Sequence, residues 1–208
     1  MSTKSLVDLR NLEDLFDLKP LFSLNTMPHS FLPNKGNFRD LIAFQKSECI
    51  YDITFYFTKK YLSKGDRTID QMIQAARSCK QNIAEGNGAG VTSAETEIKL
   101  INVAKASLQE LLLDYEDYLR QQWDLDSEKA QQTRRVCAKH NDSAFYREAI
   151  KERNDETIAN IAITLIHQTD LLLRKIIDRL QEDFVKNGGI RESMHKARTF
   201  YRNSQDKK

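Results

Sequence analysis

The sequence contains one Glu-x-x-His pair, Glu192 and His195, and this is the first spacing in it that could hold a metal ion. A di-metal carboxylate centre in a helical protein takes such a pair from each of two helices, together with further inward-facing glutamates. His140 and His167 have no acidic residue three positions before them. One pair is half of that set, so we predict no metal centre and no cofactor.

Nucleophilic catalysis and phosphate binding have as little support in the sequence. No Gly-x-Ser-x-Gly elbow occurs. Gly86, Gly88 and Gly90 make a glycine-rich stretch, but no Lys-Ser or Lys-Thr pair follows it and no predicted strand precedes it. We interpret these glycines as the turn that ends a helix.

Two glutamates, Glu85 and Glu110, could form a carboxylate pair for acid–base chemistry. They belong to two polar motifs, NIAEG at 82–86 and SLQEL at 107–111. We favour a structural interpretation, because Asn82 and Glu85 would lie in the last turn of a helix and could hydrogen-bond its orphan backbone groups. The predicted structural residues of these motifs are Asn82, Glu85, Gly86, Ser107 and Glu110.

The C-terminal segment concentrates positive charge. From Phe184 to Lys208 there are seven Lys or Arg residues and two acids, a balance of +5, whereas the whole chain carries +2. Phe200 and Tyr201 lie among these cations. Cations contact phosphates, and aromatic rings stack on bases, in proteins that bind single strands. The candidate nucleic-acid-binding residues are Lys186, Arg191, Lys196, Arg198 and Arg202.

The composition indicates one soluble helical protein. At 208 residues one domain is expected, and 7 Gly and 3 Pro are too few for a turn-rich all-β chain. Cys49, Cys79 and Cys137 have neither metal-ligand nor redox spacing, which favours a reducing compartment. No apolar run approaches the roughly 20 residues of a membrane-spanning helix, and no secretory signal begins the chain. We predict a cytoplasmic protein that does not enter a membrane.

The elements that must position these residues are organised around the stretch from Arg67 to Leu119. Apolar residues recur there at steps of three and four on two successive segments, which predicts two helices in an antiparallel hairpin. Thr92 is the expected N-cap of the second helix, with Glu95 completing a capping box. Each helix exposes an apolar stripe that needs further helices to cover it.

Further helices are expected at 37–62, 127–140, 143–153 and 155–186, each from its own apolar spacing. We therefore predict an all-α fold, an antiparallel up-and-down four-helix bundle with a short C-terminal helical suffix. The expected division of the chain is a loosely ordered extension at 1–30, the bundle at 31–186 and the basic suffix at 187–208.

Ile163 and Leu171 form a second apolar strip on the last long helix, opposite its main stripe. Such a strip needs a cover. Either the segment 124–154 supplies it or another subunit does, and we assign Ile163 and Leu171 to a candidate oligomer interface.

The motifs at 82–86 and 107–111 resemble those of the bacterial four helix bundle protein family. That family includes proteins encoded in intervening sequences of large-subunit ribosomal RNA genes and the accessory protein of diversity-generating retroelements. The resemblance covers roughly Phe31 to Phe184, and the segment from Phe184 to about Arg202 is similar to the suffix of one subgroup. It implies a bundle fold and homo-oligomers, pentamers among them.

Three functions follow as hypotheses. The first is a non-enzymatic, homo-oligomeric adaptor that binds RNA, single-stranded DNA or a nucleic-acid enzyme through the suffix. The second is a protein–protein scaffold, because Met194, Ala197 and Tyr201 recur at i, i+3 and i+7, a spacing that suits packing. The third is an enzyme, a hypothesis that no set of residues in the sequence supports.

Overall fold

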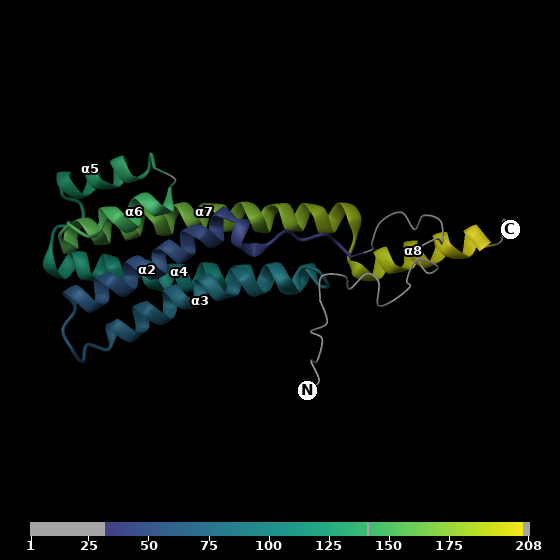
Figure 1. The fold of residues 1–208 in the computed structure, drawn as a ribbon, viewed down its shortest axis with the longest axis horizontal. Helices are drawn as coiled ribbons and strands as arrows, with labels where there is room; N and C mark the ends of the chain where they lie inside the picture. Colours follow the sequence, from purple (N-terminus) through teal and green to yellow (C-terminus); the bar gives the residue numbers. More distant parts are fainter. Residues whose placement is uncertain (1–31, 141, 206–208) are drawn as a thin grey trace, which may run out of the picture. The chain divides into compact units, whose positions relative to one another are not determined.

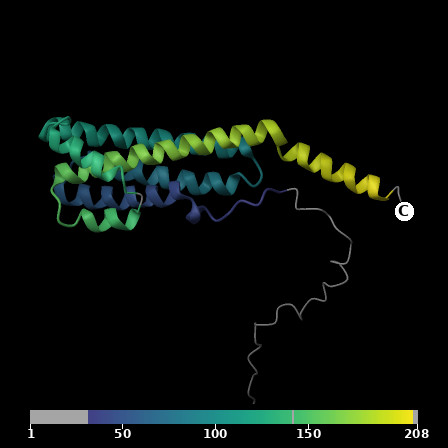
Figure 2. The same ribbon diagram turned by 90° about the horizontal axis from the view of Figure 1, so that it is seen from above.

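A computed structural model of the chain describes residues 32–140 and 142–205, and these form helices and no strand (Figures 1 and 2). The predicted all-α class is confirmed for this part of the chain, while the predicted extension at 1–30 lies outside the described residues. In chain order the elements are a 3-10 turn η2 (Phe38–Asp40), α2 (Ile42–Tyr61), α3 (Thr68–Ala89), α4 (Ala94–Gln122), α5 (Glu128–Cys137), α6 (Ser143–Ala149), α7 (Asp155–Asn187) and α8 (Ile190–Gln205).

Four long helices share one hydrophobic core. α2 packs against α3 and α7, and α4 packs against the same two helices, so the four contacts close a ring (Figure 1). The shorter α5 packs against α7, and α6 against α2. The core takes the apolar stripes of all four, and its largest fully buried side chains include Phe57, Met72, Leu108 and Leu165.

The hairpin of α3 and α4 differs from its prediction at the turn. α3 continues through Gly86 and Gly88 to Ala89, so these two glycines lie inside the helix and do not end it. The N-cap of α4 is Ser93, whose hydroxyl accepts from the backbone N–H of Thr96 at 3.1 Å, so the assignment of Thr92 as N-cap was wrong. α3 thus extends further than its glycines suggested, with Gly90 as its C-cap, and α4 begins one residue later than predicted.

Gly86 has a packing role that the helix-ending interpretation missed. A Cβ atom at this position would lie 3.3 Å from Cδ1 of Ile101 and 3.4 Å from Cβ of Leu100, both on α4. Gly88 faces open space. Gly86 therefore allows α3 and α4 to approach closely, and the tight packing offsets the conformational cost of glycine in a helix.

The second apolar strip of α7 divides in two. Ile163 is 2% exposed and belongs to the core of the single chain, so its assignment to an oligomer interface was wrong. The cover comes from the segment 124–154: α5 packs against α7, and Arg134 Nε donates to Oδ1 of Asn160 at 2.7 Å. Leu171, two turns further on, is 52% exposed.

Among the described residues, one cation is buried. Lys46 of α2 is 2% exposed, and its ammonium donates to Oε1 of Gln168 on α7 at 2.7 Å. Burial lowers the pKa of Lys46, because the charged form loses its hydration and gains a neutral partner. Removing this charge should therefore stabilise the fold.

Lys46→Met is expected to raise the free energy of unfolding by about 1–4 kcal/mol, the range seen when buried charges give way to apolar side chains of similar volume. Burial lowers the pKa of Lys46 in the folded state, so between that pKa and 10.5 the unfolded state binds more protons at this residue, and the contribution of Lys46 to stability rises with pH. The raised pKa values of Cys49 and Cys79 act in the opposite direction in both proteins, so the difference between the wild-type and Lys46→Met profiles isolates the effect of Lys46. Urea titrations across this alkaline window check both points. A lower urea midpoint for Lys46→Met would contradict the assignment of Lys46 as a destabilising charge.

Candidate nucleic-acid interface

The basic suffix is a helix of its own. α7 ends where Gly188 takes a positive φ of 75°, a conformation that favours glycine, and its N–H donates to the carbonyl of Phe184. α8 begins two residues later, and the Glu192 carboxylate accepts from the N–H of Gly189 at 2.9 Å. The helix predicted at 155–186 is confirmed, since α7 spans Asp155–Asn187.

Helical spacing sorts the candidate cations of α8. Arg191, Arg198 and Arg202 recur at i, i+7 and i+11, so at 100° per residue they fall within about 40° of one another. We call these three residues the arginine stripe. It extends about 16 Å along the helix. His195 lies at its edge, at i+4 from Arg191, and the sequence analysis considered it only as a metal ligand and not as part of this stripe.

The other two candidates are not part of the stripe. Lys196 lies on the far side of α8, away from the three arginines, by the same helical spacing. Lys186 belongs to the last turn of α7, where its ammonium is 3.3 Å from Oε2 of Glu182. The structure therefore groups three of the five predicted cations and leaves two apart.

An apolar face adjoins the arginine stripe. Ile190, Met194, Ala197 and Tyr201 recur at i, i+4, i+7 and i+11, whereas Phe200 lies on the side of α8 opposite the arginine stripe. No residue of α8 is buried, and the side chains of Met194, Phe200 and Tyr201 are 44%, 53% and 51% exposed. α8 thus presents a cationic stripe and an aromatic-bearing face together.

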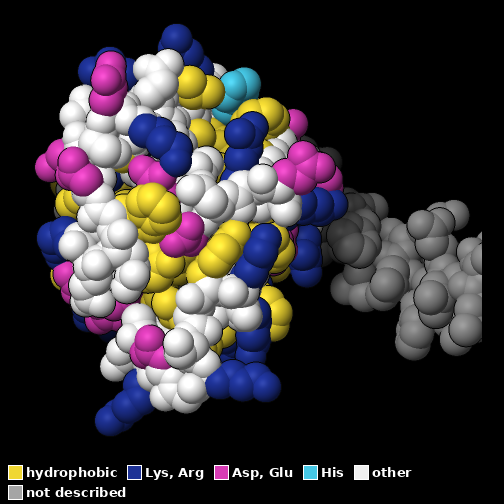
Figure 3. Space-filling model, turned by 90° about the vertical axis from the view of Figure 1, so that its left-hand side faces the viewer, with side chains coloured by type: hydrophobic (Ala, Val, Ile, Leu, Met, Phe, Trp, Pro, Cys, Tyr) yellow, Lys and Arg dark blue, Asp and Glu magenta, His cyan; other side chains and the backbone are white. Residues whose placement is uncertain are grey.

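The arginine stripe is not neutralised by its surroundings. None of its three guanidinium groups forms an ion pair or hydrogen bond with another described residue. On the body of the protein, by contrast, cations and acids alternate, as in the pair of Lys99 with Glu95 at 2.6 Å. Figure 3 shows one such face, with Lys and Arg side chains interspersed among Asp and Glu. On α8, positive charge predominates.

The motif residues of the hairpin have structural surroundings. Asn82 Nδ2 donates to the carbonyl of Ser78 at 2.9 Å, one turn back within α3. The hydroxyls of Ser78 and Ser107 lie 2.9 Å apart and join α3 to α4. Sequence reasoning missed Ser78, which carries no spacing signal of its own.

Glu85 and Glu110 are both exposed, and neither forms a hydrogen bond or ion pair with a described residue. The expected hydrogen bonds of Asn82 and Glu85 to the end of their helix are absent among the described residues, because α3 continues beyond both. The role of Asn82 is the internal bond to Ser78.

The thiols offer no activated nucleophile. Cys49, Cys79 and Cys137 are buried and free. Burial raises the pKa of Cys49 to about 11 and that of Cys79 to about 12, so both remain protonated at neutral pH. Within the described ranges no three His, Cys, Asp or Glu residues gather in a group that could hold a metal ion. No described helix is long and apolar enough to span a membrane.

Comparison of the chain with models of protein families, with curated proteins and with solved structures finds no match.

Proposed function

We propose that the protein is a non-enzymatic, cytoplasmic adaptor that binds RNA or single-stranded DNA through α8. The arginine stripe carries this proposal: three guanidinium groups without a described partner lie in line beside the exposed ring of Tyr201, on a helix with no buried residue. One guanidinium group can donate two parallel hydrogen bonds to the oxygens of a phosphate, and an aromatic ring beside it can stack on a base. The resemblance to the bacterial four helix bundle protein family, with its retroelement and ribosomal-RNA associations, supports the same proposal.

The proposed architecture is an antiparallel up-and-down four-helix bundle with α8 as its suffix. The closed ring of contacts among α2, α3, α4 and α7 supports it, as do the short turns that join α2 to α3 and α3 to α4. Three free cysteines suit the reducing conditions of the cytoplasm.

Replacing Arg191, Arg198 and Arg202 with Gln is expected to weaken binding of a fluorescein-labelled oligouridylate or oligothymidylate strongly. Each phosphate contact that is lost means that fewer counterions are released from the nucleic acid on binding. Fluorescence anisotropy with the full chain measures this loss. Lys196→Gln is the matched control, since it removes one cation from the opposite side of α8 and should cost less than any single change in the stripe. Equal losses from Lys196→Gln and from Arg198→Gln would contradict the stripe as the site.

A second candidate function is a protein–protein scaffold, in which α8 packs against another chain, such as a nucleic-acid enzyme. The uncovered apolar face of Ile190, Met194, Ala197 and Tyr201 favours it, since a 16-residue helix is marginal in water unless one face is covered. Replacing Met194 and Tyr201 with Ser separates the two candidates. The scaffold loses its partner on this change, whereas the nucleic-acid adaptor keeps the salt-dependent part of its affinity.

The proposal also includes homo-oligomers, with pentamers among the assemblies that the family resemblance implies. Leu171 is the exposed part of the second apolar strip, and a charge buried in an interface without a partner disrupts it. Leu171→Glu is therefore expected to give a folded species of smaller mass in sedimentation velocity. Val103→Glu, which places the same charge at an exposed aliphatic position of α4, is the control. A monomer for the unmutated chain would contradict self-association.

A further inference from the structure

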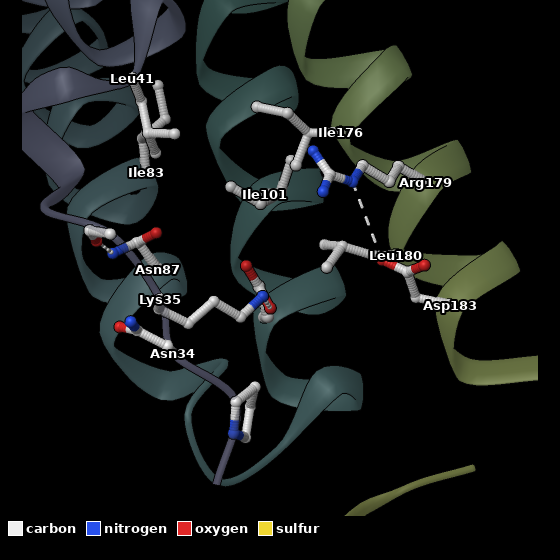
Figure 4. A pocket seen from close by; sticks show the side chains of 13 residues that line it. Asn34, Lys35, Leu41, Ile83, Asn87, Ile101, Ile176, Arg179, Leu180 and Asp183 are labelled. Atoms are coloured by element: carbon white, nitrogen blue, oxygen red, sulfur yellow. Dashed lines mark hydrogen bonds and ion pairs between the residues drawn. The ribbon is translucent and has the colours of Figure 1, made fainter. Parts of the chain in front are cut away.

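A cavity of about 350 Å³ opens between the segment before η2 and the helices α3, α4 and α7 (Figure 4). Its volume lies within the range of roughly 300–1,000 Å³ that is typical of small-molecule sites. The floor is apolar and is built from α3, α4, α7 and Leu41, which lies between η2 and α2. Its floor residues are Leu41, Ile83, Ile101, Ile176 and Leu180.

One wall of the cavity is a strap, residues 33–36, held by two contacts. Lys35 Nζ lies 2.6 Å from Oε2 of Glu97, and Asn87 Nδ2 donates to the carbonyl of Gly36 at 3.0 Å. These contacts fix the strap to α4 and α3. The wall is therefore part of the fold and not a loop that happens to pass by.

The side chain of Glu97 is buried and held in place by its neighbours. It is 5% exposed, and its carboxylate lies against the backbone at Gly90, where a Cβ atom would be 2.1 Å from Oε2. A larger residue at position 90 would require the Glu97 carboxylate to shift. The Lys35 ammonium pairs with this buried carboxylate at 2.6 Å, which is closer than the 3.8 Å between Arg179 Nε and Oδ2 of Asp183, so Glu97 is engaged within the fold.

Arg179 is a charged residue of the cavity whose hydrogen-bond donors are not all used by described partners. Figure 4 shows its side chain extending from α7 toward Ile101, and the side chain is 85% exposed, so the guanidinium lies at the mouth of the cavity. Its only described partner is Asp183, with Nε 3.8 Å from Oδ2, which leaves the two terminal nitrogens of the guanidinium without a described partner. The amide of Asn34, on the opposite wall, also has no described hydrogen bond.

We propose that this cavity binds a small monocarboxylate with a compact apolar body. The carboxylate would accept a pair of hydrogen bonds from the terminal nitrogens of Arg179. The apolar body would cover Ile101, Ile176 and Leu180 and release the water over them. This site is separate from α8, and the inference does not depend on nucleic-acid binding.

Isothermal titration of the full chain with octanoate, octanol and octylamine tests the proposal. Octanoate is expected to bind more tightly than octanol, which lacks the charge, and octylamine more weakly than both. Preferential binding of octylamine would overturn the assignment, because it would make Asp183 the recognising group. Equal binding of octanoate and octanol would overturn it as well, because Arg179 would then contribute nothing.

Arg179→Gln is expected to reduce octanoate affinity about tenfold or more and to leave octanol affinity unchanged, since it removes a charge-assisted pair of hydrogen bonds. Lys175→Gln is the matched control: it removes the same charge one turn earlier on α7, from a residue that does not line the cavity. Arg179 is exposed, so neither change should affect folding. Unchanged octanoate affinity in Arg179→Gln would refute the site.

Discussion

Leu108→Ala is expected to lower the free energy of unfolding by about 2–5 kcal/mol, because it removes apolar contacts and leaves a cavity that the neighbouring helices cannot fill. Leu108 is fully buried in the middle of α4, where that helix meets α3 and α7. Urea unfolding followed by circular dichroism measures the change.

Leu113→Ala is the control for this prediction. Leu113 lies on the same helix but is 56% exposed, so its truncation should change the free energy of unfolding far less. A Leu108→Ala variant with the urea midpoint of the unmutated chain would show that α4 does not pack as described.

Gly86→Leu is expected to lower the free energy of unfolding by about 1–3 kcal/mol, because the new side chain must push α3 away from α4. A Cβ atom already lies within 3.4 Å of both Ile101 and Leu100, and a leucine adds three more carbons there. The same urea titration measures this effect.

Gly88→Ala, in the same helix, should have the opposite sign. A Cβ atom at Gly88 meets nothing, and alanine in a helix is more stable than glycine by roughly 0.5–1 kcal/mol. If both variants proved more stable than the unmutated chain, the close approach of α3 and α4 at Gly86 would be wrong.

The helices were predictable from the sequence because their apolar residues repeat at steps of three and four over long stretches. α4 and α7 begin and end within a few residues of their predicted limits. The turn between α3 and α4 was not predictable from the sequence, because three glycines in five residues suggest a helix end by local propensity alone. The close approach of Gly86 to Ile101 explains why a glycine lies inside α3, and it joins residues on two different helices.

The candidate site was predictable in part. The concentration of cations after Phe184 is visible in the sequence, and the spacing of Arg191, Arg198 and Arg202 places them on one side of a helix once α8 is known to be helical. The burial of Ile163 was not predictable, since the periodicity of α7 does not say whether α5 or a second subunit covers the strip. Nor was the cavity at Arg179, because its walls come from four separate segments.

The most direct test of the nucleic-acid proposal is the salt dependence of oligouridylate binding in two variants that lose equal charge. The first replaces Arg191, Arg198 and Arg202 with Gln, and the second replaces Lys64, Arg77 and Lys175, which are exposed cations of the body. Plots of log K against log salt concentration from about 50 to 200 mM are expected to flatten by about 2 in the first variant, at 0.7 per lost contact. The second variant should keep the slope of the unmutated chain. A first variant that keeps its affinity and slope, or two variants that lose both equally, would contradict α8 as the binding site.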